Sequence, residues 1–218
     1  MTVSSSLKAH SENDNGQWHT LSDHLESVAR IAELFASSFD GNATARIAGL
    51  LHDAGKSRPE FQQLLAGLRN RSDETHHSKY GAALAASLND NIAALSIAGH
   101  HEGLPDLSNL KSTVNQCKTE RSDSLKNIEH TLHQMFPEFK DVRPSSPSYL
   151  KAPLNAEFFT RMIFSTLVDA DWLDTERHFK GDIRSLAWPL LERLSERFFD
   201  KQRAFQDENT GATEGMNL

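Results

Sequence analysis

Apolar residues recur three and four positions apart along most of the chain, which is the spacing of one face of an α-helix. The sequence has no run of alternating β-branched residues, the pattern typical of a half-buried strand. The pattern therefore predicts an all-α fold. The expected helices cover roughly residues 22–38, 43–54, 59–68, 78–88, 91–101, 107–117, 120–136, 156–174 and 188–205.

Several of these helices carry residues that favour a helix end. Ser22 is expected to cap the first helix, and Gly55 is expected to end the second in the left-handed conformation. Ser57 and Glu60 have the spacing of a capping box around Pro59, which suits the first turn of the third helix.

The stretch 156–174 is apolar nearly all the way round, which predicts a central and mostly buried helix with Trp172 in the core. A loop with four prolines, residues 137–153, precedes it. This loop is expected to separate two helical layers or to act as a lid.

The length of 218 residues fits one domain. We expect a polar leader (1–18), a helical domain (19–205) and a flexible tail (206–218).

The single cysteine, Cys117, excludes an intramolecular disulfide framework and thiolate metal sites. The polar N-terminus lacks a signal-peptide pattern and the apolar stretches are too short to span a bilayer, so we expect a cytoplasmic protein without a membrane partner. The net charge of −7 argues against a broad basic DNA-coating surface.

The feature with the most chemical content is His52-Asp53, at the predicted end of the second helix. Adjacent helical side chains diverge by about 100°. The pair can therefore converge on one ion only where the last turn opens towards a cavity. Alone, it also fits a capping aspartate beside a hydrogen-bonded histidine.

Five more histidines accompany this pair. His24 lies on an apolar helix stripe and is expected to point inward. The doublets His76-His77 and His100-His101 stand at helix boundaries, where side chains can point into a cleft. Each could be a surface or capping residue, but a shared polynuclear metal site accounts for all of them.

Two carboxylates lie within the most apolar predicted helix. A buried, unpaired carboxylate is costly, so an acid there needs a cation or a metal as partner. Asp171 shares its stripe with Phe164, Leu167 and Val168, which makes it the more buried candidate. Asp169 remains its rival.

Imidazole and carboxylate ligands without thiolates suit divalent transition metals such as Mn²⁺, Ni²⁺, Co²⁺ or Fe²⁺, with Mg²⁺ or Zn²⁺ as alternatives. Two such ions would activate water and stabilise the oxygens of a phosphodiester. Lys56 follows the His-Asp pair by one turn and could bind a phosphate or neutralise the developing charge, although it also fits an ordinary solvated lysine.

The order of these residues resembles the HD superfamily of metal-dependent phosphohydrolases, an all-α helical bundle with a metal cleft between helices. The segments that carry a closer resemblance are Leu21-Ser22-Asp23-His24-Leu25, Leu51-His52-Asp53-Ala54-Gly55-Lys56, His77-Ser78-Lys79-Tyr80-Gly81-Ala82, Gly99-His100-His101-Glu102-Gly103-Leu104 and Ala170-Asp171-Trp172. They resemble the HD nuclease domain of the CRISPR-associated helicase-nuclease of type I interference systems, over roughly residues 19–174.

The resemblance implies two bound metal ions. One would be held by His24, His52, Asp53 and Asp171, and the other by Asp53 as a bridge with His77, His100 and His101. Asp53 and Lys56 would be the catalytic residues, with Lys56 also binding substrate. His76 has no clear counterpart and is expected to lie on the surface or behind the ligands.

The resemblance further implies a metal-dependent nuclease of single-stranded DNA acting in antiviral defence. Its partners would be a superfamily 2 helicase domain, fused or separate, and an RNA-guided surveillance complex. The chain lacks a phosphate-binding Gly-Lys-Ser/Thr loop, so we expect the helicase to lie beyond the tail. Bases could stack on Trp18 or Tyr80, although packing also explains both. Two alternatives stay open: a phosphohydrolase of nucleotides or cyclic nucleotides, and a non-catalytic helical interaction domain.

Overall fold

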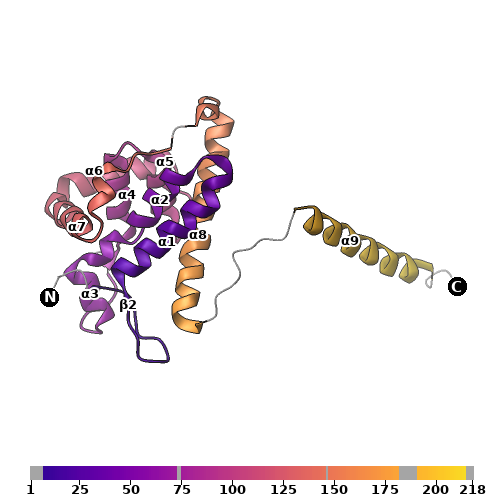
Figure 1. Ribbon diagram of the computed structural model, residues 1–218, viewed down its shortest axis with the longest axis horizontal. Coiled ribbons are helices and arrows are strands. Elements are labelled where there is room, and N and C mark those ends of the chain that lie inside the picture. Colours follow the sequence, from indigo (N-terminus) through magenta and orange to yellow (C-terminus); the bar gives the residue numbers. More distant parts are fainter. Residues whose placement is uncertain (1–6, 73–74, 146, 182–190, 215–218) are drawn as a thin grey trace. The chain divides into compact units, whose positions relative to one another are not determined.

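The computed structural model describes residues 7–72, 75–145, 147–181 and 191–214 (Figure 1). Within these ranges the regular structure is helical except for one short antiparallel hairpin, which confirms the predicted all-α class. The hairpin pairs β1 (Lys8–His10) with β2 (His19–Thr20). The α-helices are α1 (Leu21–Ala36), α2 (Asn42–Leu51), α3 (Pro59–Leu65), α4 (Ser78–Ser87), α5 (Asn91–Gly99), α6 (Leu107–Glu120), α7 (Ser122–Met135), α8 (Pro153–Lys180) and α9 (Leu191–Glu214).

The chain divides into two compact units, Met1–Asp182 and Ile183–Leu218. The first contains α1 to α8 and the hairpin, so residues 8–10 of the predicted leader belong to it. It ends before residue 205, where the sequence analysis placed the domain end. The predicted start of the last helix, at residue 188, lies outside the described residues, and the predicted tail is helical as far as Glu214.

The core of the first unit lies where α1 packs against α2 and α8, and where α5 packs against α4 and α8. Small residues allow close approach here: a Cβ added at Gly49 on α2 would lie 2.4 Å from the Cα of Ala29 on α1. The packing therefore brings the ends of α2 and α5 towards the C-terminal half of α8. Among the described helices, none combines the length and apolarity that a membrane span requires.

Two predicted caps are wrong. The N-cap of α1 is Thr20, whose hydroxyl accepts a hydrogen bond from the Asp23 amide at 3.2 Å, because α1 begins one residue before Ser22. Ser57 donates its hydroxyl to the Ala54 carbonyl at 2.7 Å and so caps no helix. Pro59 does occupy the first turn of α3 as predicted.

Gly55 has a different role from the predicted one. Helix α2 ends at Leu51, and Gly55 lies in a short 3₁₀ helix (Ala54–Ser57), outside the left-handed region. A Cβ at this position would lie 2.3 Å from the carbonyl oxygen of His77. A glycine is required here because the segment before α4 passes directly against it.

Helix α8 is buried on one face only. Phe159, Ile163 and Leu167 belong to the core, whereas Phe158 and Trp172 are 63% and 66% exposed. The prediction that Trp172 lies in the core is therefore wrong. The Pro-rich segment contains two short 3₁₀ helices, Pro137–Asp141 and Ser148–Lys151, and connects α7 to α8.

Candidate metal centre

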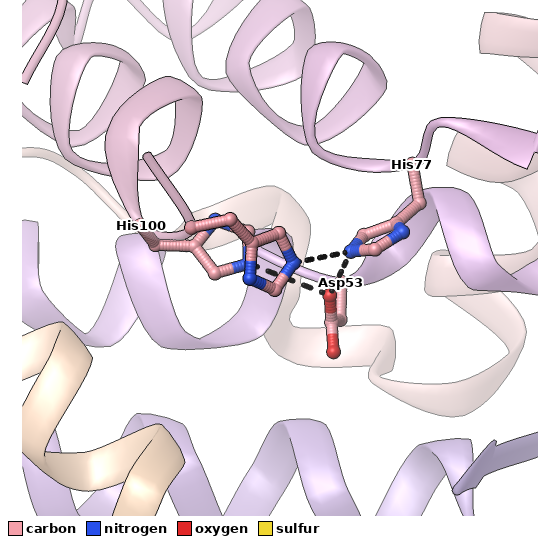
Figure 2. A group of neighbouring side chains, drawn as sticks. Asp53, His77 and His100 are labelled. Atoms are coloured by element: carbon pink, nitrogen blue, oxygen red, sulfur yellow. Dashed lines mark hydrogen bonds and ion pairs between the residues drawn. The ribbon is translucent and has the colours of Figure 1, made fainter. Parts of the chain in front are cut away.

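The predicted ligand residues converge from five segments of the first unit. His24 lies on α1 and Asp171 on α8. The others stand at helix ends: His52 and Asp53 follow α2, His77 precedes α4, and His100 and His101 follow α5. Figure 2 shows that His77 and His100 reach Asp53 from two sides.

Adjacent side chains can converge at His52-Asp53 because the helix ends between them. His52 keeps helical angles (φ −54°, ψ −41°), whereas Asp53 leaves the helix with φ −111° and ψ 11°. This change of direction turns both side chains to the same side. The predicted opening of the last turn is present, although it occurs before Gly55.

The first group of donor atoms comprises Nε2 of His24 and His52 with carboxylate oxygens of Asp53 and Asp171. His24 Nε2 lies 3.2 Å from His52 Nε2, 3.2 Å from Asp53 Oδ2 and 3.5 Å from Asp171 Oδ1. Neighbouring donors on one transition metal ion are separated by about 3 Å, since each bond is about 2.0–2.2 Å long. The four atoms therefore already have the spacing of a ligand set.

The second group uses the other oxygen of Asp53. His77 Nε2 lies 2.9 Å from Asp53 Oδ1 and 2.9 Å from His101 Nε2, and His100 Nε2 lies 3.7 Å from Asp53 Oδ1. Asp53 thus directs Oδ2 at one group and Oδ1 at the other. This arrangement suits a carboxylate shared by two ions.

Backbone carbonyl groups orient two of the buried imidazoles. Nδ1 of His52 donates to the Gly49 carbonyl at 2.8 Å, and Nδ1 of His100 donates to the Ile97 carbonyl at 2.7 Å. A carbonyl only accepts, so the lone pair of each ring lies on Nε2, as metal ligation requires. His100 Nε2 is buried without a hydrogen-bond partner among the described residues. A divalent cation would satisfy it, so the residues present fit a metal ion.

Strong electrostatic interactions hold Asp53 ionised. Burial alone would raise its pKa, but the charge of Lys56, aided by His52 and His77, keeps the pKa well below its usual value. Lys56 is buried, with Nζ 2.6 Å from Asp53 Oδ2 and 3.2 Å from the Ala9 carbonyl oxygen. It is therefore not a solvated lysine: it neutralises the central carboxylate.

Position favours Asp171 over Asp169 as the candidate ligand from α8. Asp171 Oδ1 lies within 3.6 Å of both His24 and His52, whereas Asp169 is exposed on another face of the helix. Burial raises the pKa of Asp171, but its proximity to His52 and His24 outweighs burial and holds the pKa below its usual value. His76 is exposed, in agreement with a surface position.

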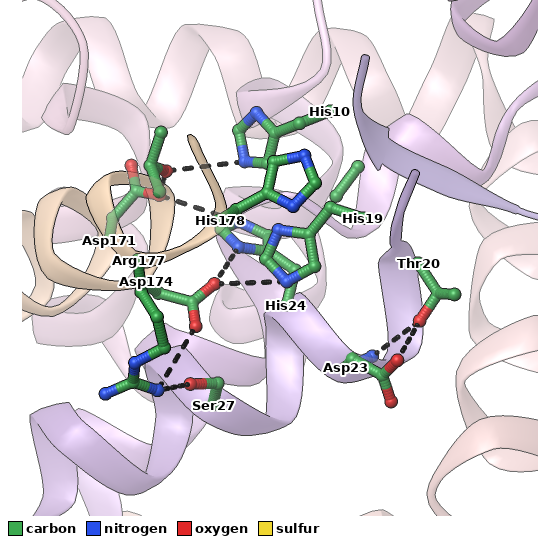
Figure 3. Close-up of polar contacts among 12 residues, drawn as sticks. His10, His19, Thr20, Asp23, His24, Ser27, Asp171, Asp174, Arg177 and His178 are labelled. Atoms are coloured by element: carbon green, nitrogen blue, oxygen red, sulfur yellow. Dashed lines mark hydrogen bonds and ion pairs between the residues drawn. The ribbon is translucent and has the colours of Figure 1, made fainter. Parts of the chain in front are cut away.

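The sequence analysis missed Asp174, which is buried one turn beyond Asp171. Its Oδ2 accepts a hydrogen bond from Nδ1 of His24 at 2.8 Å, and it also faces His19 and Arg177 (Figure 3). Burial lowers the pKa of His24, but hydrogen bonds to Asp174 and Asp53 outweigh it and raise the pKa to about 9. The i+3 spacing from Asp171 on the same stripe was the available signal.

The hairpin and the end of α8 add three further imidazoles that the sequence analysis did not assign. The rings of His10, His19 and His178 stack on one another beside His24 (Figure 3). Burial lowers the pKa of His10 to about 3 and that of His19 to about 4. Both rings are neutral at pH 7 and form a wall of the centre.

The centre opens into a cavity of about 560 Å³. Its lining includes donors from both groups, among them Asp53, His100, His101 and Asp171, together with Lys56 and the outer stripe of α8. A ligand in this cavity would contact the donor atoms directly. The arrangement can therefore hold divalent ions next to a substrate.

Comparison with known proteins identifies one family. The model of the HD domain matches residues 21–130, slightly more than half of the chain. The matched stretch includes every predicted ligand except Asp171. No curated protein matches the chain significantly.

Proposed function

The chain belongs to the HD-domain family, and on that premise we propose that it is a metal-dependent nuclease that hydrolyses phosphodiester bonds of single-stranded DNA. Family membership indicates a metal-dependent hydrolase. The observation that carries the proposal further is the shared carboxylate of Asp53, with a group of donors on each side and an open cavity beside them.

The chain's own residues define how the reaction would proceed. When two divalent ions are bound, they supply an activated water and stabilise the charge on the phosphate oxygens. Asp53 would contribute one carboxylate oxygen to each ion, while the Nε2 atoms of the surrounding histidines would complete the two ligand sets. The backbone carbonyls behind His52 and His100 prevent these rings from rotating.

Lys56 has two roles in this proposal. It holds Asp53 ionised and correctly oriented through the 2.6 Å contact, and it lines the cavity where a phosphate would lie. Lys56 would therefore support the candidate ligand Asp53 and add positive charge on the side of the centre where substrate binds.

The acidic chain is expected to bind DNA weakly by itself. We therefore propose that a superfamily 2 helicase domain and an RNA-guided surveillance complex deliver the strand, as in CRISPR interference. The resemblance of the five motifs to the nuclease domain of type I systems supports this role.

The test compares circular single-stranded DNA with mononucleotides and cyclic nucleotides in Mn²⁺ and in Ni²⁺. We expect the circle to be cut, and Asp171→Asn to lower the rate by at least 100-fold while reducing the metal bound per chain. Asp169→Asn, an exposed acid two residues away, is the matched control and keeps parental values.

Turnover of nucleotides without cleavage of the circle would favour a nucleotide phosphohydrolase. Less than one metal ion per chain at saturation, with no turnover of any substrate, would favour a non-catalytic interaction domain.

A further inference from the structure

Two large aromatic side chains stand on the cavity wall formed by α8. Val168, Trp172, Thr175 and Phe179 follow one another at intervals of four, three and four, and with Glu176 they line the cavity that contains Asp53 and Asp171. Trp172 directly follows the candidate ligand Asp171 in the chain. The position of its ring relative to the candidate metal centre is therefore fixed by the backbone of α8.

Both aromatic rings are accessible. Trp172 is 66% exposed and Phe179 is 40% exposed, although burying such side chains is ordinarily favourable. The Phe179 ring meets the rings of His178 and His10 edge to face, with centroids 4.7 Å and 6.0 Å away. An apolar surface held open beside a catalytic centre is typical of a ligand-binding site.

We propose that Trp172 and Phe179 form a stacking site for unpaired nucleobases of the substrate strand, next to the phosphate that is cut. This inference rests on the proposed function and specifies how that site selects its substrate. Stacking tolerates any base sequence, because every base has a π-face, and it requires a base that is not already paired.

The charges around the cavity favour stacking over phosphate attraction as the source of affinity. Its two lysines are already paired: Lys56 Nζ lies 2.6 Å from Asp53, and Lys180 Nζ lies 3.0 Å from Glu176. Asp53, Asp171 and Glu176 also line the cavity, so beyond the phosphate that the ions would hold, a polyanionic backbone gains little there. A neutral aromatic surface attracts a base without that cost.

The position of the rings also favours a nucleotide over a protein partner. Trp172 shares the cavity with Asp53, His100 and Asp171, so a protein that covered it would close the metal centre. A cavity of about 560 Å³ is within the usual range for a small-molecule site and can accept a nucleotide unit.

The aromatic residues considered from the sequence are less suitable. Tyr80 is fully buried, with its hydroxyl accepting a hydrogen bond from Arg121 at 3.1 Å and Arg58 lying over its ring. Trp18 lies near Lys8 and is not among the residues that line the two cavities at the centre.

The test measures kcat and KM of the full chain in Mn²⁺ on a ten-residue oligothymidylate and on an abasic strand with the same phosphates. We expect Trp172→Ala to raise KM for oligothymidylate about 10-fold, since each stacked base contributes about 1–3 kcal/mol, with kcat and bound metal near parental values. Phe179→Ala changes KM in the same direction, and Trp172→Phe, which keeps an aromatic ring, restores most of the affinity.

Phe158→Ala is the matched control. Phe158 is on the same helix with nearly the same exposure, 63%, but it lies about 21 Å away along the axis and outside the cavity. It should leave both KM values unchanged. The parent should bind the abasic strand about 10-fold more weakly than oligothymidylate, and Trp172→Ala should lose this preference.

Parental KM values in Trp172→Ala, with the parent still cutting circular single-stranded DNA, would overturn the stacking site and leave the proposed function intact. Normal cleavage by Trp172→Ala with loss of binding to a protein partner would assign these rings to protein docking and also overturn it. A parent that cuts no single strand would overturn both.

Discussion

At the scale of single residues, the centre raises the pKa of one histidine and lowers the pKa of others. His24 has a pKa of about 9 because Asp174 and Asp53 accept its protons, whereas burial lowers the pKa of His10 to about 3 and of His101 to about 4. Asp53, a candidate ligand, and Asp174, which contacts Nδ1, thus retain a proton on His24 when no ion is bound. Metal binding must release that proton.

This contrast predicts how the stability of the metal-free protein depends on pH. Between pH 6.5 and 9, His24 is protonated in the folded protein and deprotonated in the unfolded chain. The free energy of unfolding should therefore fall as the pH rises, by on the order of 1 kcal/mol per pH unit. As the pH decreases below 6.5, the free energy of unfolding should also fall, because His10, His19 and His101 become protonated in the unfolded chain before they do in the folded protein. Urea denaturation in EDTA at several pH values measures both effects.

Asp174→Asn is the variant that isolates the alkaline part, because it removes an acceptor that raises the pKa of His24. The fall above pH 6.5 should become smaller in this variant and remain unchanged in Asp169→Asn. A free energy of unfolding that is constant from pH 6.5 to 9 in the parent would contradict the prediction.

The sequence predicted the candidate ligands but not the residues that contact them from outside the two groups. His52-Asp53 and the histidine doublets stood out because their residue types and spacing carry chemistry by themselves. Asp174 and His10 did not, since their importance arises from contact with His24, 150 residues from Asp174 in the chain. Only the tertiary structure brings them together.

At the scale of elements, the 3₁₀ helix after α2 acts as a support for the segment before α4. Gly55 allows that segment to pass close enough for His77 to reach Asp53. Gly55→Ala should therefore cost about 2 kcal/mol of stability, as overpacking in a tight site does, and should reduce the metal bound per chain. Thermal melts and metal analysis of the purified protein provide the measurement.

Gly67→Ala is the control for this substitution. Gly67 has φ 71° with open space around its missing Cβ, so an alanine there should cost about 1 kcal/mol through backbone strain alone and leave metal binding intact. Normal metal binding in Gly55→Ala would show that the close approach to His77 does not position the ligand.

Helix positions were predictable because periodicity is a local property of the sequence. The hairpin was not, since its strands are three and two residues long and too short to show an alternating pattern. The cap of α1 was assigned to Ser22 because Thr20 and Ser22 have similar preferences. Trp172 was assigned to the core because an apolar residue facing a cavity gives the same pattern as one facing a neighbouring helix.

At the scale of the whole molecule, the first compact unit contains all the parts of the centre. Every donor residue, Lys56 and Asp174 lie within Met1–Asp182. A chain cut after residue 182 should therefore fold, with a melting temperature within a few degrees of the parent and the same metal content. Aggregation or loss of bound metal would contradict this prediction and assign a stabilising role to residues 183–218.

The sequence analysis extended the domain to residue 205 because residues 188–205 have the periodicity of a packed helix. Such a pattern identifies an amphipathic face and does not identify what covers it. Leu194, Phe198 and Phe199 on α9 contribute to that pattern, and periodicity alone could not place the boundary.

The wide separation of the ligands along the chain has a consequence for folding kinetics. Residues from α1 and α8 meet only after a very long loop has closed, so an unfolded chain offers no preformed chelate to an ion. Metal should therefore have little effect on the rate of folding and should mainly slow unfolding, because it holds the first and last parts of the domain together. A bound ion would therefore prolong the lifetime of the native state without speeding its formation.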